Sequence, residues 1–147
     1  MKIYADTGFI CSLYAPDENT RSACQFMNHH EDPICFSWLN QVEFRNALRL
    51  RVFRKEISNA ERDQSLNLLL ADLSAGVFEN VEPYQSNVLV EAERLSSQYS
   101  QKLGTPSLDI LHVAMATVLG CQRFLSFDIR QIKLAKATGI KVPKLKL

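Results

Sequence analysis

Short apolar segments alternate with longer helical patterns from one end of the chain to the other. Segments with the length and composition of buried strands occupy residues 2–5, 33–38, 77–81, 123–127 and 140–145. The intervening periodicity predicts a turn and short helix over 6–15 and helices over 17–30, 39–55, 59–74, 85–102, 105–120 and 129–139. This alternation favours an α/β fold in three layers, with a central parallel sheet between two layers of helices.

The size and composition suit one globular domain spanning residues 1–147. Of the 147 residues, 46% are hydrophobic and 22% are charged, which is typical of a folded domain with a single core. The formal net charge is only +1, so the chain is no polycation. Any contact with a nucleic acid must therefore come from a local basic patch.

The cysteines and the N-terminal segment indicate a cytoplasmic location. The four cysteines, at positions 11, 24, 35 and 121, show no CxxC spacing, so neither a zinc ribbon nor a redox motif is expected. Asp6 interrupts the N-terminal apolar segment before it reaches the length of a signal peptide. No uninterrupted apolar segment reaches the roughly 18 residues of a membrane span. We expect a soluble protein that makes no membrane contact.

Asp109 is the only carboxylate in the otherwise apolar segment 105–120. One interpretation is structural: Thr105 caps the helix, Pro106 takes its first position, and Asp109 favours the helix dipole from the first turn. The other is functional, because a carboxylate that faces packed apolar surface is costly unless it is paired or binds a metal.

Three further acids raise the same question. Asp6 and Asp128 follow predicted strands, and the carboxyl ends of parallel strands meet at one edge of a sheet, although either residue could simply be a helix N-cap. Glu43 shares a helix face with the apolar Leu39 and Ala47, although an arginine could pair with it.

Together these acids point to a metal site. Clustered carboxylates repel one another, so such a site either raises their pKa values or binds cations. Mg²⁺ and Mn²⁺ prefer oxygen ligands of this kind, and one or two such ions can promote the hydrolysis of a phosphodiester. The interpretation therefore depends on all four side chains meeting in one place.

The order of these motifs resembles that of a known family. "YADTGFI", "NQVEFRNAL", "SLDILHVAMA" and "FLSFDIRQIKLAKATGIKV" are similar to segments of the PIN-domain ribonucleases, in particular the VapC-like toxins of toxin–antitoxin pairs. The resemblance implies a PIN-like fold, one or two Mg²⁺ or Mn²⁺ ions, and cleavage of single-stranded RNA. The metal-binding and catalytic residues that it implies are Asp6, Glu43, Asp109 and Asp128.

Further expectations follow from the same resemblance. Thr7 and Ser126 match small hydroxyl residues beside the first and last acids, where they would orient the ligands or form caps. A small antitoxin and a second copy of the chain are the implied protein partners. Several relatives carry an extra acid soon after the last one, whereas here Ile129, Arg130 and Gln131 follow Asp128, which puts a second metal position in doubt.

Basic and histidine residues have two interpretations each. The helix predicted over 39–55 contains Arg45 and Arg49, and Arg130 lies close to Asp128 in sequence. These arginines either form a solvated surface or bind RNA phosphates. His112, one turn after Asp109, is either a buried hydrogen-bonding residue or part of the site.

Two other functions fit some of the pattern. A receiver-type phosphoacceptor domain also gathers acids at strand ends, but the segment 33–38 ends without an acid and no lysine ends a late strand. A catalytically silent PIN-like binding module is the second alternative. The intact set of acids disfavours it.

Overall fold

The computed structural model describes residues 1–145. Strands β1 (Ile3–Ala5), β2 (Ile34–Phe36), β3 (Phe78–Asn80) and β4 (Arg123–Leu125) form one sheet in the order β3-β2-β1-β4. Every neighbouring pair is parallel, and Ile3 on β1 lies opposite Ile34 on one side and Arg123 on the other. The predicted parallel sheet is therefore confirmed, with β1 at its centre.

Alternation along β1 divides the core in two. Ile3 and Ala5 point to one face of the sheet and Tyr4 points to the other, as the period of two in a strand requires. All three side chains are fully buried. Both faces of the sheet are thus covered, and the three-layer α/β fold predicted from the sequence is confirmed.

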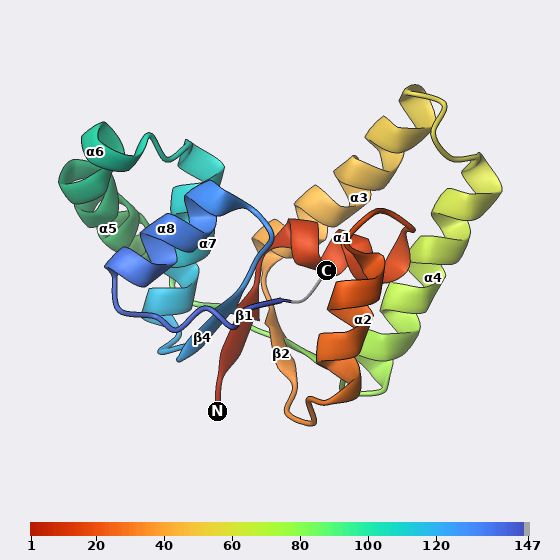
Figure 1. Ribbon diagram of the computed structural model, residues 1–147, viewed down its shortest axis with the longest axis horizontal. Helices are drawn as coiled ribbons and strands as arrows, with labels where there is room; N and C mark the ends of the chain where they lie inside the picture. The colour runs from red at the N-terminus through yellow and green to blue at the C-terminus, as the bar shows by residue number, and fades with distance from the viewer. Residues whose placement is uncertain (146–147) are drawn as a thin grey trace.

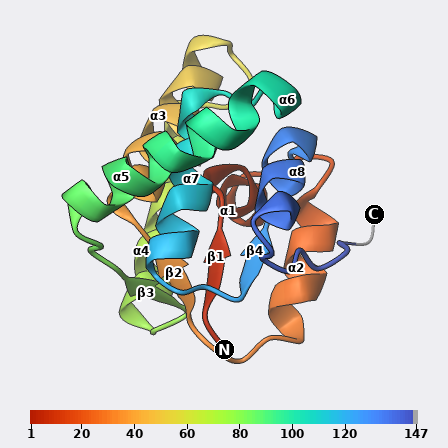
Figure 2. The same cartoon turned by 90° about the vertical axis from the view of Figure 1, so that its left-hand side faces the viewer.

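Different helices cover the two faces. On the side of Ile3 and Ala5 lie α1 (Thr7–Tyr14), α2 (Thr20–Asn28), α3 (Trp38–Phe53) and α4 (Asn59–Ser74), with α3 and α4 projecting beyond the sheet (Figure 1). On the side of Tyr4 lie α5 (Gln85–Leu95), α7 (Ser107–Val118) and α8 (Ile129–Ala137). Helix α7 runs between α5 and α8 and packs against both (Figure 2).

Several predicted boundaries were wrong for local reasons. The predicted helix over 17–30 begins only at Thr20, because Asp17 accepts the amide of Asn19 in a turn. The predicted helix over 85–102 is interrupted by a π-helical turn, η1 (Ser96–Ser100), before the short α6 (Gln101–Leu103). Residues 140–145 form only an isolated bridge between Lys141 and Arg123, and Pro143 has no amide to extend it.

The start of α7 also differs from the prediction. Pro106 occupies the N-cap position and Ser107 is the first helical residue, so Thr105 does not cap the helix. Asp109 does lie in the first turn, as expected. Within residues 1–145, no helix is both long and apolar enough to cross a membrane.

Candidate active site

The carboxyl ends of β1 and β4 meet at one edge of the sheet, where Asp6 follows β1 directly. Asp6 is 2% exposed and caps α1, because its Oδ1 accepts the amide of Phe9 at 2.7 Å. Its Oδ2 accepts a hydrogen bond from the hydroxyl of Ser126. Burial raises the pKa of Asp6 to about 6, although both hydrogen bonds favour the charged form; the nearby charge of Asp128 adds to the rise.

Ser126 joins Asp6 to Asp128. While its hydroxyl donates to Asp6, its Oγ accepts the amide of Asp128 at 2.9 Å. Asp128 in turn caps α8, accepting the amide of Arg130 on Oδ1 at 2.8 Å. Asp6 and Asp128 therefore each cap a helix, as the structural interpretation requires. They also lie close to each other at one edge of the sheet, as the ends of parallel strands predict.

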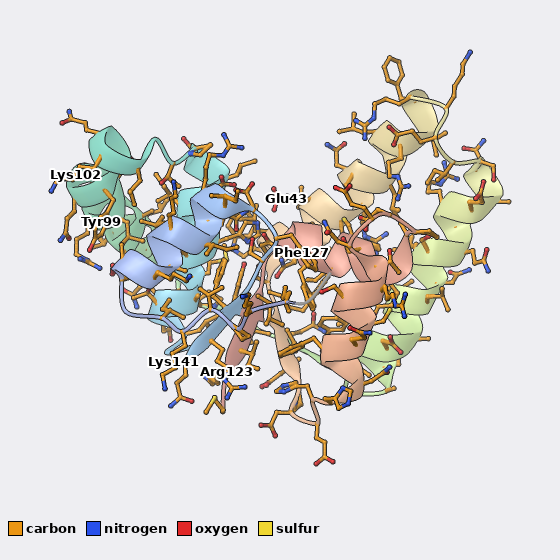
Figure 3. All side chains as sticks on the ribbon, viewed as in Figure 1. Glu43, Tyr99, Lys102, Arg123, Phe127 and Lys141 are labelled. Carbon is orange, nitrogen blue, oxygen red and sulfur yellow. The ribbon has the colours of Figure 1, made fainter. Side chains whose placement is uncertain are left out.

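Glu43 reaches the same edge from the middle of α3 and lies between the two sets of helices (Figure 3). The hydroxyl of Thr7 donates to its Oε1 at 2.8 Å, and His112 Nε2 contacts the same oxygen. Burial alone raises the pKa of Glu43, but the hydrogen bond and charge of His112 and the hydrogen bond from Thr7 outweigh it, so the pKa lies below its usual value.

The hydrogen bonds around Glu43 have a consistent direction. An ionised carboxylate only accepts, so His112 Nε2 carries a proton and donates to Glu43, while His112 Nδ1 lies 2.8 Å from the hydroxyl of Tyr4. On the other side, Asn40 Nδ2 donates to Thr7 Oγ1 at 3.2 Å, and Thr7 donates to Glu43. Two buried chains of donors thus end on one carboxylate oxygen.

Asp109 enters the edge from the first turn of α7. Its Oδ1 accepts from Gln131 Nε2 at 3.1 Å, whereas its buried Oδ2 has no hydrogen-bond partner. Burial raises the pKa of Asp109, and the negative charges of Asp128 and Glu43 raise it further, while Arg130 opposes them. Asp109 is therefore influenced by the charges of Asp128 and Glu43, and Asp6 by that of Asp128, although the four acids come from four segments of the chain.

The chemistry of this edge suits a hard divalent cation. Its donors are carboxylate oxygens, and the buried Asp109 Oδ2 lacks a partner. Among residues 1–145, however, no three Asp, Glu, His or Cys side chains are grouped closely enough to hold one ion together. Mg²⁺ commonly retains several waters and uses only one or two carboxylates, so the donor set fits such an ion without a closed cage.

The residues that orient these acids are harder to predict from the sequence than the acids themselves. The sequence allows two interpretations of His112, which in the structure is 2% exposed and bridges Tyr4 and Glu43. Asn40 is fully buried, and besides donating to Thr7 it completes a capping box with Ser37. The spacing of Ser37 and Asn40 before an apolar helix was the available signal for the cap. No local pattern indicated the contact between Gln131 and Asp109.

The predicted basic residues separate in space. Arg130 is exposed, and its Nε lies 3.8 Å from Asp128 Oδ1. Arg45 and Arg49 instead line a groove of about 280 Å³ together with Leu48 and residues of α4, including Asp63. The structure thus places Arg130 beside the acids and the other two arginines on the side of α3 that faces α4.

Comparisons with known proteins agree with this architecture. A comparison with curated sequences found no match. Among solved structures, FitAcB from Neisseria gonorrhoeae is 18% identical with a TM-score of 0.63, and the match covers 97% of this chain and 96% of that one. VapBC2 from Rickettsia felis, bound to a DNA fragment from its promoter, is 14% identical with a TM-score of 0.68 and coverages of 99% and 100%.

A third similar structure is VapC20 from Mycobacterium tuberculosis, a toxin that cleaves the sarcin–ricin loop. It is 16% identical, with a TM-score of 0.68 and coverages of 94% and 95%. At such low identity these matches establish a shared fold. The model of the PIN domain matches residues 3–137, a range that includes all four acids. With this match over most of its length and a fold shared with VapC proteins, the chain belongs to the PIN domain family.

Proposed function

We propose that this protein is a metal-dependent endoribonuclease that cleaves single-stranded RNA and acts as the toxin of a toxin–antitoxin pair. The observation that carries the proposal is the meeting of Asp6, Glu43, Asp109 and Asp128 at one edge of the sheet in a PIN-domain chain. The fold shared with VapC20, a toxin that cleaves the sarcin–ricin loop, supports the choice of RNA as the substrate.

The acids and their donors account for the proposed chemistry. One or two Mg²⁺ or Mn²⁺ ions bound among the acids would polarise the phosphodiester and supply hydroxide for attack. The donors from Thr7 and His112 hold Glu43 charged and fixed, and Ser126 holds Asp6. Arg130, exposed beside Asp128, would contact a substrate phosphate.

Arg45 and Arg49 have a separate role in the proposal. Because they line the groove between α3 and α4, they would contact RNA away from the reacting phosphate. Such contacts contribute affinity that falls as salt rises. They position the substrate and take no part in cleavage.

Cleavage is tested by sequencing the 5′ ends of RNA fragments. The parent should produce defined 5′-phosphate ends with Mg²⁺ or Mn²⁺ and none with EDTA. Asp6→Asn and Asp109→Asn should abolish these ends while retaining the parent's circular dichroism spectrum. Glu93→Gln, an exposed acid on α5, is the matched control and should cut as the parent does. Equal cleavage by either site variant would refute the assignment, and the absence of both cleavage and metal binding would favour the silent module.

The toxin role needs protein partners as well as activity. We propose a small antitoxin as partner and a homodimer as the working assembly, in line with the structural similarity to VapBC2. Light scattering on the purified protein measures the dimer. Expression of the parent should arrest bacterial growth, expression of Asp6→Asn should not, and co-expression of the antitoxin should restore growth. If the parent and Asp6→Asn both arrested growth, the toxicity would not depend on the acids.

A further inference from the structure

Unpaired buried oxygens gather where α7 and α8 begin. Thr105 Oγ1, just before α7, Asp109 Oδ2, in its first turn, and Gln131 Oε1, in the first turn of α8, are all buried without a hydrogen-bond partner. Leaving such an atom unpaired in a buried place is unfavourable, so each one requires an explanation, such as a bound ion or water. Two of these oxygens belong to side chains that touch each other.

The contact between Asp109 and Gln131 fixes the direction of both groups. Gln131 Nε2 donates to Asp109 Oδ1 at 3.1 Å, which assigns the amide nitrogen to that side and leaves Oε1 as the free acceptor. Gln131 is 7% exposed, and its backbone amide caps α8 on Asp128 Oδ1 at 3.4 Å. The cap therefore fixes the backbone at Gln131, and the bond to Asp109 orients its side chain.

The free oxygens need a hydrogen-bond donor or a cation as partner. An amide carbonyl and an ionised carboxylate only accept hydrogen bonds. The charges of Asp128 and Glu43 make the surroundings of Asp109 more negative. Arg130 is the nearby cationic side chain, but its Nε faces Asp128 Oδ1 at 3.8 Å. The missing partner therefore comes from solution, and oxygen ligands select a hard cation.

We propose that Gln131 Oε1 and Asp109 Oδ2 bind the same divalent cation, which makes Gln131 a ligand of the metal site. The inference rests on the proposed function for the presence of that cation. It also accounts for the segment after Asp128, where Ile129, Arg130 and Gln131 supply no carboxylate. The neutral amide oxygen of Gln131 then takes the place of a carboxylate ligand. The affinity of the site for the ion is accordingly lower than it would be with an acid at position 131.

Binding of Mn²⁺ alone, measured by electron paramagnetic resonance and calorimetry without RNA, tests the proposal. Gln131→Leu removes the oxygen and should weaken Mn²⁺ binding about tenfold, whereas Gln131→Glu adds a charge and should strengthen it about tenfold. Gln64→Leu and Gln64→Glu, at an exposed position of α4, are the matched controls and should bind as the parent does. Thermal unfolding in EDTA verifies that each variant is folded.

The outcomes separate this inference from the proposed function. If both Gln131 variants fold and bind Mn²⁺ with the parent's affinity, water satisfies Gln131 and the inference is wrong, even when the parent cleaves RNA. If the parent binds no Mn²⁺, the inference is wrong as well. If the Gln131 variants shift the affinity in opposite directions but the parent cuts no RNA, the ligand assignment stands and the nuclease proposal fails.

Discussion

The two sides of the acidic edge differ in how the protein treats their oxygens. On one side, Asp6 and Glu43 receive hydrogen bonds from Phe9, Ser126, Thr7 and His112. On the other side, Asp109 keeps one buried oxygen without a partner. The first pair is therefore oriented by the fold itself. On the second side, Asp109 Oδ2 remains free to bind an ion or a water molecule from solution.

Removing the centre of the well-bonded side should have the largest effect. His112→Ala leaves the buried hydroxyl of Tyr4 without its partner nitrogen, takes a donor from Glu43 and opens a cavity. We expect a loss of about 4 kcal/mol in the free energy of unfolding, measured by urea denaturation. RNA cleavage should fall about 10- to 100-fold. His29→Ala, at an exposed site, should change neither quantity. If His112→Ala lowered stability but left cleavage at the level of the parent, His112 would merely fill space.

Asp6→Asn should increase stability when divalent ions are removed. The pKa of Asp6 is about 6 in the fold against 3.8 for an unperturbed carboxyl. As pH rises from about 4 to about 6, the unfolded chain releases this proton first, so the parent loses up to about 3 kcal/mol of stability. Asn does not titrate and avoids this loss.

Urea denaturation in EDTA at pH 4 and pH 7 measures the effect. The advantage of Asp6→Asn should be near zero at the lower pH and complete at the higher one. Asp109→Asn, which replaces a less buried acid, should gain less. If Asp109→Asn gained more stability than Asp6→Asn, the expected difference between the two sides of the acidic edge would be wrong.

Asn40→Ala should have an intermediate effect on the well-bonded side. The substitution removes the capping box with Ser37 and the donor to Thr7 Oγ1. Together these losses should cost about 2 kcal/mol in the free energy of unfolding. Asn46→Ala, at an exposed position of the same helix, is the control. The midpoints of thermal unfolding of the two variants are measured in one buffer. Equal midpoints would contradict the prediction.

The smallest effect is expected for RNA binding by the exposed arginines. Arg130→Ala, introduced together with Asp6→Asn to prevent cleavage, should weaken binding of single-stranded RNA about fivefold and lower the salt slope by about one. Arg49→Ala should weaken binding less, because Arg49 lies in the groove between α3 and α4. Fluorescence anisotropy at several salt concentrations gives both values. A larger loss for Arg49→Ala would place the main RNA contact on that groove.

The sequence predicted the architecture better than the contacts of the site. Alternating strands and helices are local patterns, and they were sufficient to predict the parallel sheet and the positions of Asp6 and Asp128 at the ends of its strands, whereas Glu43 and Asp109 were assigned from their apolar helix faces and the family resemblance. The contact of His112 with Glu43 joins residues 69 positions apart, and that of Gln131 with Asp109 joins residues 22 apart. The second contact follows from the packing of α7 against α8, and the first from the way the sheet brings side chains of α3 and α7 together; no local periodicity encodes either arrangement.

Helix boundaries show the same division. Ser58 and Glu61 form the capping box that begins α4, and the predicted range of that helix is confirmed. By contrast, Thr105 looked like a cap in the sequence, but its hydroxyl is buried and makes no such bond. A cap depends on backbone angles that tertiary packing decides. A hydroxyl residue before a predicted helix therefore marked the helix start correctly at Ser58 and wrongly at Thr105.

The central position of β1 has a consequence for biosynthesis. The first strand to emerge from the ribosome pairs on one side with β2, and its other side must wait for β4, more than a hundred residues later. The amide of Asp6 itself donates to the carbonyl of Leu125. A nascent chain therefore lacks the assembled acidic edge until the segment from β4 into α8 has been translated and released from the exit tunnel.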